Sequence, residues 1–377
     1  MTASHVGDRA NPSIACDVLA EQAVGVSDPN PRVGCLLVSP EGAVTLGTGH
    51  TERAGSPHAE IMALRAAHAA GHDVRGATAH VTLEPCSHHG RTPPCCDALI
   101  EAGIAKVVVA IEDPNPLVAG RGIAKLRAAG IEVEVIGGEW GEASRELNIG
   151  FFSRMIRGRP WVRMKIAASL DGRTALASGA SQWITGEAAR TDGHAWRKRA
   201  GAVLTGIGTV RDDDPRLDVR LVSTDKQPLR VVVDSKLEIA PSARLLQPPG
   251  QALIYTASDD AAPIAALAAP HIEVARLPAN EQGKIDLAAM LADLARREIN
   301  ELHIEAGEKL NGSLLREGLV DELLIYLAPR LLGPGRGMAA IGPLASLAES
   351  LDFEFVDALR IGPDLRLRLR PPGRAAF

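Results

Sequence analysis

The alternation of strand-like and helix-like segments is the feature that most limits the fold of this chain of 377 residues. Residues 33–39 and 44–49 are two apolar runs on either side of a Pro-Glu-Gly turn, which predicts a β-hairpin. Residues 59–70 carry apolar side chains at helical spacing, and residues 79–83 form a short strand-like run. Further elements of these two kinds are expected at residues 95–102, 106–111, 122–129, 131–136 and 139–147. Such alternation predicts an α/β fold with a largely parallel sheet covered by helices on both faces.

A second α/β pattern begins after the basic turn at residues 157–160. Its strands are expected at residues 162–167, 202–205, 229–233, 252–255, 272–275, 301–304 and 322–327. The Ala- and Pro-rich stretch 256–284 predicts a helix with flexible flanks. Residues 353–359 and 365–369 alternate apolar and polar side chains, which predicts an antiparallel pair at a sheet edge. At about 150 residues per domain the chain has room for two or three domains, and we expect two, at residues 1–148 and 149–377.

The composition argues against several classes of function. The formal net charge is −5 and only 3% of the residues are aromatic, which argues against a basic, base-stacking nucleic-acid surface. No run of about 18 apolar residues is present, so no transmembrane helix is expected. The N-terminus lacks the charged and apolar regions of a signal peptide. We therefore expect a cytoplasmic protein that acts on a small molecule rather than on nucleic acid or a membrane. We also expect a homo-oligomer, either a dimer or a tetramer.

The cysteines are concentrated near the N-terminus. All 5 lie in the first hundred residues, and Cys86, Cys95 and Cys96 fall within eleven residues of one another. In a cytoplasmic chain such a cluster predicts a metal-binding or catalytic site rather than disulfides. His58 and Glu60 form a His-Ala-Glu motif upstream of the cluster. One imidazole and two thiolates supply three ligands for zinc and leave the fourth position of a tetrahedral site open, as a catalytic centre requires.

The spacing of these residues fits one site if both motifs open helices. Residues two apart point about 200° away from each other in mid-helix, so His58 and Glu60 can share a site only in a first turn. Cys95 and Cys96 diverge by about 100°, so only one of them is expected to bind. Cys96 lies on the apolar side of its helix, and we assign Cys95 to zinc and Cys96 to packing. A purely structural zinc site is the main alternative, but it would not explain Glu60.

The motif matches the His-x-Glu…Pro-Cys-x-x-Cys signature of zinc nucleobase deaminases, except that eight residues separate the cysteines here. With this insert, residues 82–95 resemble the deaminase domain of the bifunctional riboflavin-biosynthesis deaminase/reductase family, as do residues 30–35. The resemblance implies a cytidine-deaminase-like three-layer α/β/α domain. It also implies that Asn30 and the loop at residues 88–92 hold a pyrimidine and its ribose phosphate. His50-Thr51 departs from the aromatic-His pair that the family often carries, which puts any substrate contact by that histidine in doubt.

The expected chemistry of this first part is hydrolytic deamination. Zinc lowers the pKa of a bound water towards neutrality. Glu60 would take the proton from that water and deliver it to the departing amino group. The family resemblance implies 2,5-diamino-6-(5-phosphoribosylamino)pyrimidin-4-one as the substrate.

The second part contains no complete G-x-G-x-x-G after a strand, so its Rossmann signal is weak. Residues 304–313 instead place a glycine turn between a strand and a helix, where free N–H groups can bind an anion. A plain strand-to-helix turn is the alternative. Residues 165–173, 181–185, 209–217 and 233–235 resemble the reductase domain of the same family, which is similar in fold to dihydrofolate reductase.

This second resemblance implies NADPH as the cofactor and a set of contacts. The implied NADPH contacts are Ala167, Trp183, Thr209, Asp213, Ser235, Gly307, Glu308, Lys309, Leu310, Asn311, Gly312 and Ser313. The implied substrate contacts are Lys165, Ser181, Arg197, Leu217, Arg220 and Glu305. Arg197 and Arg220 could grip a ribose phosphate bidentately, although an exposed-surface role is the alternative for each.

The implied reaction reduces the ribosyl side chain to a ribityl chain, giving 5-amino-6-(5-phosphoribitylamino)uracil. Lys165 or Glu305 could assist the proton transfer, and the sequence does not decide between them. It does not decide between NADPH and NADH either. Two other functions stay open at this point: a deaminase acting on nucleic acid with an accessory domain, and a non-catalytic zinc protein with a nucleotide-sensing domain.

Overall fold

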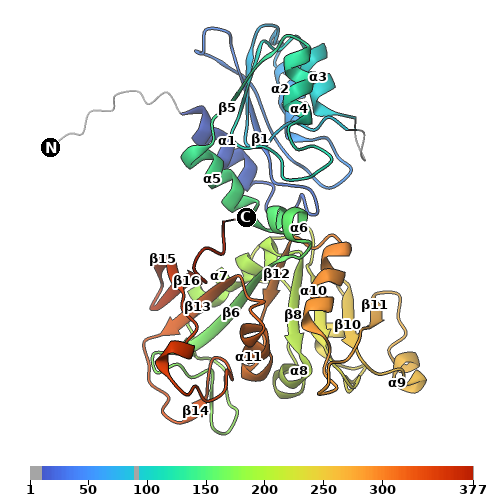
Figure 1. Ribbon diagram of the computed structural model, residues 1–377, viewed down its shortest axis with the longest axis vertical. Helices are drawn as coiled ribbons and strands as arrows, with labels where there is room; N and C mark the ends of the chain where they lie inside the picture. The colour runs from blue at the N-terminus through green and yellow to red at the C-terminus, as the bar shows by residue number, and fades with distance from the viewer. Residues whose placement is uncertain (1–10, 89–92, 377) are drawn as a thin grey trace, which may run out of the picture. The chain divides into compact units, whose positions relative to one another are not determined.

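The computed structural model describes residues 11–88 and 93–376, and the chain divides into two compact units after Arg157. Each unit is an α/β assembly built around a sheet of its own (Figure 1). Within the described residues, no helix is long and apolar enough to cross a membrane. The sequence placed the domain boundary at 148/149. The structure keeps the next helix, α6 (Ile149–Arg157), in the first unit.

The first unit contains a five-stranded sheet in the order β2-β1-β3-β4-β5. Its strands are β1 (Gly34–Val38), β2 (Thr45–His50), β3 (Thr78–Val81), β4 (Lys106–Val109) and β5 (Glu132–Val135). The expected hairpin of β1 and β2 is confirmed. The expected largely parallel sheet has one exception in this unit: β2, β3, β4 and β5 run in the same direction, but β1 lies between β2 and β3 and is antiparallel to both. The sheet is therefore mixed.

Six helices of the first unit are described: α1 (Pro12–Glu21), α2 (Ala59–Ala69), α3 (Cys95–Glu101), α4 (Arg121–Ala128), α5 (Gly138–Leu147) and α6. The sequence predicted α2 to α5 but neither α1 nor α6. Glycines allow the closest packing of helix on sheet. A Cβ at Gly49 would lie 2.3 Å from the carbonyl oxygen of Ala59, and one at Gly34 would lie 2.0 Å from that of Cys16. This close approach fixes the start of α2 against the hairpin.

The second unit contains a nine-stranded sheet in the order β11-β10-β9-β8-β12-β6-β13-β16-β15. Its strands are β6 (Trp161–Ser169), β8 (Ala202–Gly206), β9 (Leu229–Val233), β10 (Ala252–Thr256), β11 (Ile272–Arg276), β12 (Glu301–Ile304), β13 (Glu322–Ala328), β15 (Glu354–Ile361) and β16 (Asp364–Arg370). All pairings from β11 to β13 are parallel. The last two strands form the antiparallel edge pair that the sequence predicted. Two short strands, β7 (Ala175–Leu176) and β14 (Gly335–Arg336), pair separately.

Helices cover this second sheet. They are α7 (Glu187–Arg199), α8 (Ile207–Asp213), α9 (Ala261–Ala266), α10 (Leu287–Arg296) and α11 (Glu308–Arg316), with 3-10 turns at Arg244–Leu246 and Leu347–Glu349. The predicted helix between residues 256 and 284 is only the short α9, which is followed by β11. The main core lies between α10 and the strands, where Met290, Leu291 and Leu294 pack against Met164 and Leu204. The carboxyl ends of the parallel strands all meet at one edge of the sheet.

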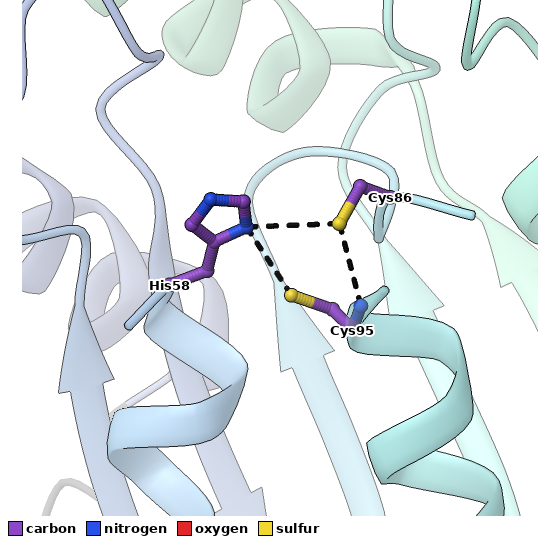
Figure 2. A group of neighbouring side chains, drawn as sticks. All are labelled: His58, Cys86 and Cys95. Carbon is purple, nitrogen blue, oxygen red and sulfur yellow. Dashed lines mark hydrogen bonds between the residues drawn. The ribbon is translucent and has the colours of Figure 1, made fainter. Parts of the chain in front are cut away.

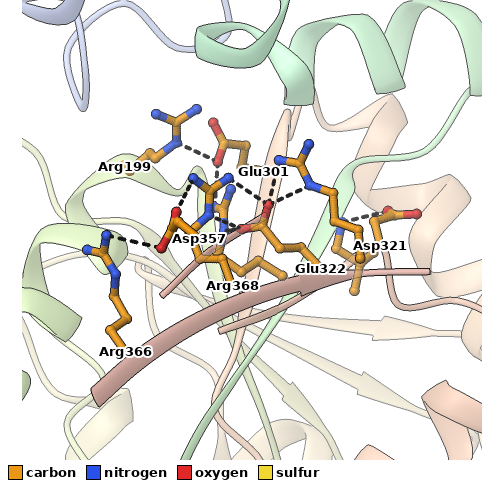
Figure 3. Close-up of polar contacts among 10 residues, drawn as sticks. Arg199, Glu301, Asp321, Glu322, Asp357, Arg366 and Arg368 are labelled. Carbon is orange, nitrogen blue, oxygen red and sulfur yellow. Dashed lines mark hydrogen bonds and ion pairs between the residues drawn. The ribbon is translucent and has the colours of Figure 1, made fainter. Parts of the chain in front are cut away.

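A buried ion-pair network joins the parallel strands to the C-terminal hairpin (Figure 3). Arg163 on β6 has a side chain only 1% exposed, and it donates to Glu301 at 2.7 Å and to Glu322 at 2.5 Å. Arg368 and Arg370 on β16 also contact Glu322, at 3.1 Å and 2.7 Å. Removing one member of a buried pair typically costs about 3–5 kcal/mol, because the other charge is left without compensation. The network therefore stabilises the packing of the C-terminal hairpin, β15 and β16, against the parallel strands.

Candidate functional sites

Three side chains predicted to bind zinc converge in the first unit (Figure 2). His58 is the N-cap residue of α2, Cys86 lies in the loop after β3, and Cys95 is the first residue of α3. The Nδ1 atom of His58 lies 3.6 Å from the Cys86 sulfur and 3.3 Å from the Cys95 sulfur. All three ligand atoms lie within 4.8 Å of one another. Zinc–ligand bonds of about 2.0–2.3 Å in a tetrahedron place ligand atoms about 3.5 Å apart, so the group fits one zinc ion.

The ionisation of the two thiols also suits a metal. Cys95 hydrogen-bonds to Cys86 through its side chain, which lowers the pKa of Cys86 to about 4 although burial opposes this shift. The backbone N–H of Cys95 donates to the same sulfur at 3.3 Å. The pKa of Cys95 is raised, because it shares its proton with Cys86 and is buried. The lowered pKa of Cys86 favours a thiolate at this position, and zinc readily takes thiolate and imidazole ligands.

Cys96 points away from this group. Its thiol is fully buried and donates to the carbonyl oxygens of Pro85 at 3.3 Å and Gly122 at 3.6 Å. Burial raises its pKa to about 12. The contacts of Cys96 are therefore packing contacts, whereas Cys95 joins the ligand group.

Glu60 is the second residue of α2 and is 4% exposed. Burial raises its pKa, and the nearby charge of Cys86 raises it further. Because His58 stands before the helix and Glu60 in its first turn, both reach the same group, as the spacing required.

Glu84 is a buried carboxylate near the ligands to which the sequence assigned no role. Its oxygens accept N–H bonds from Asp113, Gly120, Gly122 and Ile123, at 3.2, 2.9, 2.9 and 3.2 Å. It thereby holds the segment from β4 to α4 beside the Pro85-Cys86 turn. The sequence signal that could have identified Glu84 is its position two residues before the ligand Cys86.

The remaining predicted contacts of the first unit are only partly described. Asn30 is half-buried in the turn after α1, where its N–H donates to the carbonyl oxygen of Ser27 at 2.9 Å. His88 is half-buried, and residues 89–92 of the predicted substrate loop lie outside the described residues. His50 ends β2, and Thr51 accepts an N–H bond from Val33 at 3.2 Å.

The second unit contains a cleft of about 1680 Å³ at the carboxyl edge of its parallel strands. It is lined by all six predicted substrate contacts: Lys165, Ser181, Arg197, Leu217, Arg220 and Glu305. It is also lined by eleven of the twelve predicted NADPH contacts: Ala167, Trp183, Thr209, Asp213, Ser235, Gly307, Glu308, Lys309, Leu310, Asn311 and Ser313. Gly312 is the exception, because a Cβ there would lie 2.1 Å from the carbonyl oxygen of Ala340. That glycine allows close packing of the helix against a following loop and does not line the cleft.

Lys165, Arg197 and Glu305 form a charged cluster at one end of the cleft. Arg197 binds Glu305 bidentately, with N–O distances of 2.5 Å and 3.0 Å, and Lys165 lies 3.6 Å from the same carboxylate. Burial tends to raise the pKa of Glu305, but the charges of Arg197 and Lys165 outweigh it and hold that pKa well below its usual range. Glu305 is thus a carboxylate at neutral pH. Arg197 is engaged with this carboxylate, and its predicted contact with the substrate phosphate stays a prediction.

His194 on α7 is a supporting residue that no sequence motif identified. It is buried, and its Nδ1 accepts the backbone N–H of Arg220 at 3.1 Å. Burial, followed by the charges of Arg197 and Arg220, lowers its pKa to about 4, so it is a neutral acceptor at pH 7. The Arg220 side chain contacts Asp218 at 2.5 Å. His194 therefore holds the backbone of a predicted substrate contact.

The turns that follow β8 and β12 meet at the centre of the cleft. Gly307 is the N-cap of α11, and a Cβ there would lie 3.6 Å from the Thr209 hydroxyl. Ser181 donates to Asp213 at 3.2 Å. The indole of Trp183 is 59% exposed with the Arg190 guanidinium 4.6 Å from its centre. Free N–H groups at the start of α11 suit a pyrophosphate, and the cleft is large enough for a dinucleotide.

Comparison with known proteins decides the family. The RibD C-terminal domain model matches residues 160–367, and the model of the cytidine and deoxycytidylate deaminase zinc-binding region matches residues 12–111. The riboflavin biosynthesis protein RibD of Escherichia coli strain K12 is 44% identical over 364 residues, which cover 93% of this chain and 96% of that protein. The chain belongs to the RibD family. The RibD of Aquifex aeolicus is 42% identical over 347 residues.

Solved structures match over nearly the whole chain. Acinetobacter baumannii RibD, form 1, is 41% identical with a TM-score of 0.85, covering 96% of this chain and 98% of that one. A Thermotoga maritima deaminase/reductase is 33% identical, also with a TM-score of 0.85, covering 96% and 97%. These matches confirm the family, the α/β class with a cytidine-deaminase-like first domain, and zinc and NADPH as cofactors. They do not favour a nucleic-acid deaminase.

Proposed function

We propose that this chain carries out two successive steps of riboflavin biosynthesis, with the deaminase in residues 1–148 and the reductase in residues 149–377. The matched Thermotoga maritima protein is named a diaminohydroxyphosphoribosylaminopyrimidine deaminase and 5-amino-6-(5-phosphoribosylamino)uracil reductase. The observation that carries the proposal is the presence of two separate sites. One is the group of His58, Cys86 and Cys95 with Glu60 beside it, and the other is the cleft with Lys165 and Glu305.

In the deaminase, His58, Cys86 and Cys95 hold the zinc ion. When bound, zinc supplies a water activated as a nucleophile at neutral pH. The buried Glu60 carboxylate accepts a proton as this water attacks the ring carbon that bears the amino group. Glu60 then delivers the proton to the departing nitrogen, so that ammonia leaves and the ring becomes a pyrimidinedione. Glu60 is only 4% exposed, so its carboxylate is largely shielded from bulk water.

In the reductase, the chain's residues position the ring-opened sugar and supply a proton. When bound, NADPH supplies a hydride to the first carbon of the sugar imine. Glu305 is held as a carboxylate by Arg197, so it can accept hydrogen bonds but has no proton to donate. We therefore assign the proton that adds to the imine nitrogen to Lys165. Arg220 also contacts a carboxylate, that of Asp218, but its side chain is 44% exposed against 12% for Arg197. With its backbone held by His194, Arg220 is therefore the more accessible candidate for the phosphate.

The two chemistries should be separable. A Glu60→Ala protein is expected to lose deamination but to reduce the deaminated intermediate at a near-normal rate when that compound is supplied. The reason is that each site draws its residues from a different unit. The measurement is a pair of single-step assays, one following ammonia release and one following NADPH oxidation. Loss of both steps in a folded Glu60→Ala protein would contradict the two-site proposal.

Zinc content should distinguish the adjacent cysteines. Cys95→Ser is expected to lose most of its zinc, because serine removes one of three ligand atoms. Cys96→Ser is the matched control, since its sulfur contacts backbone carbonyls instead. Elemental analysis of both purified variants makes the comparison. The reverse result would overturn the ligand assignment.

Two expectations from the sequence are also kept as proposals. We propose that the protein is cytoplasmic and that it forms a homo-oligomer. Cell fractionation tests the first proposal, and light scattering on the purified chain tests the second. Recovery in the membrane fraction, or a monomer mass at working concentration, would reject the respective proposal.

A further inference from the structure

One end of the reductase cleft carries two lysines with no assigned role. Lys236 follows Ser235 directly after β9, and Lys284 precedes Ile285 before α10. All four residues line the cleft. The two segments are in contact, because the backbone N–H of Ile285 donates to the Ser235 hydroxyl at 3.2 Å. Lys236 and Lys284 are therefore each the sequence neighbour of one of these two hydrogen-bonded residues.

Hydrogen bonds hold the turn that carries Lys284 in one conformation. Asn280 accepts the N–H groups of Gln282 at 3.1 Å and Lys284 at 2.9 Å through its side chain. The N–H of Asn280 in turn donates to the carbonyl oxygen of Lys284 at 2.7 Å. The backbone of Lys284 is thus fixed before any ligand arrives, which reduces the ordering cost of binding.

Among the described residues the two lysines have no acidic partner, whereas five other cations of the cleft do: Lys165, Arg197, Arg211, Arg220 and Arg336. Arg211 lies 3.4 Å from Glu238, and Arg336 lies 2.5 Å from Asp212. Arg197 and Arg220 are paired with carboxylates as described above. Within residues 11–88 and 93–376, no ion pair involves Lys236 or Lys284. Their charges are therefore available to an anionic ligand.

The strand order gives the direction of a bound dinucleotide. Adjacent strands run in the order β9-β8-β12-β6. The reacting end lies at β6 and β12, where Lys165 and Glu305 meet, and the start of α11 follows β12 at the centre. A dinucleotide with its nicotinamide at the reacting end and its pyrophosphate at α11 extends its adenosine half past β8 towards β9. That is the end where Lys236 and Lys284 lie.

We propose that Lys236 and Lys284 form the subsite for the 2′-phosphate of the adenosine ribose, and that this subsite selects NADPH over NADH. The inference rests on the assignment of the cleft to NADPH. A phosphate monoester carries roughly −1.5 to −2 charges at pH 7, where NADH has a neutral hydroxyl. Lysine binds phosphate as a point charge and can reach it on a flexible stem. The two lysines therefore add affinity only for the phosphorylated cofactor.

Calorimetry on the full chain tests this without turnover. The probes are 2′,5′-ADP, 5′-AMP, NADPH and NADH, and the variants are Lys236→Gln, Lys284→Gln and the double substitution. We expect the double variant to bind 2′,5′-ADP and NADPH about tenfold or more weakly, the size of a lost charge-assisted contact. Its dissociation constants for 5′-AMP and NADH should change by less than about threefold, since screening by solvent limits long-range effects. Lys236→Arg should retain most of the preference for NADPH.

The controls distinguish failure of this inference from failure of the proposed reductase function. Lys226→Gln removes one exposed lysine that does not line the cleft, and it should leave all four affinities unchanged. Wild-type affinity for NADPH in the double variant would overturn the inference, and so would an equal loss of NADPH and NADH, which would place the lysines at the pyrophosphate. If the wild-type chain bound neither NADPH nor NADH, the proposed reductase function itself would fail.

Discussion

An enzyme carrying Glu60→Gln is expected to keep its zinc and to deaminate about 10²- to 10⁴-fold more slowly, the usual contribution of a positioned acid–base group. Glutamine preserves the size of a side chain that is 4% exposed, so the first turn of α2 should keep its packing. It cannot accept a proton from the attacking water or return one to the leaving amine. Ammonia release at saturating substrate gives kcat, and elemental analysis of the same sample gives the zinc content.

The matched control for this substitution is Glu101→Gln, which changes an exposed glutamate at the end of α3 in the same unit. It should deaminate at the wild-type rate. If Glu60→Gln turned over nearly as fast as this control while holding one zinc per chain, Glu60 would be a structural residue and the proton would take another route.

The zinc group could be predicted because its geometry is local. His58 and Cys95 each stand at the start of a helix, so a few adjacent residues fix the direction of each side chain. The choice between Cys95 and Cys96 followed from helix periodicity alone, and the carbonyl contacts of Cys96 agree with it.

The strand arrangement of the first unit could not be read from the alternation of elements. The connection from β2 through α2 to β3 does join two strands of the same direction, as such crossovers usually do. However, β1 lies between them, antiparallel to both. Strand order depends on which edges meet in three dimensions, and a one-dimensional pattern of strands and helices does not contain that information.

Contacts between distant residues account for the other differences. Arg197 was predicted to contact a phosphate, which stays a prediction, but its carboxylate partner Glu305 is 108 residues away in the chain and could not be predicted. Gly312 looked like part of a phosphate-binding turn, but the carbonyl oxygen of Ala340 occupies the space beside it. No local sequence pattern predicts contact partners that are so distant in the chain. The motif at residues 304–313 nevertheless located the cleft correctly, because the glycine turn and the start of α11 are adjacent in sequence.

Replacing Lys165 by methionine is expected to slow reduction about 10²- to 10⁴-fold while deamination continues. The sequence left the proton donor open between Lys165 and Glu305. The structure separates them, because Arg197 and Lys165 together overcome the effect of burial and hold the pKa of Glu305 well below its usual range. Lys165 is the member of the pair that carries N–H groups, and its Nζ lies 3.6 Å from the Glu305 carboxylate. Lys165 is thus the residue we assign as the proton donor.

Lys165→Met is the better test because it should impair the reaction without affecting the stability of the fold. Without Lys165, Glu305 retains its bidentate partner Arg197, and methionine fills a similar volume, so Lys165→Met should remain folded. Glu305→Gln would instead leave Arg197, whose side chain is only 12% exposed, without its carboxylate, a change that typically costs about 3–5 kcal/mol of stability. A lower melting temperature is therefore expected for Glu305→Gln and not for Lys165→Met.

Single-turnover reduction of supplied deaminated intermediate is the deciding measurement, with NADPH affinity determined separately by calorimetry. Lys165→Met should bind NADPH with near wild-type affinity and fail in the hydride-transfer step, and Lys226→Met, outside the cleft, should behave as wild type. A Lys165→Met enzyme that reduced its substrate at the wild-type rate would show that the imine nitrogen receives its proton from another group. Water or the substrate's own hydroxyl groups would then be the remaining donors, because the Glu305 carboxylate has no proton to give at neutral pH.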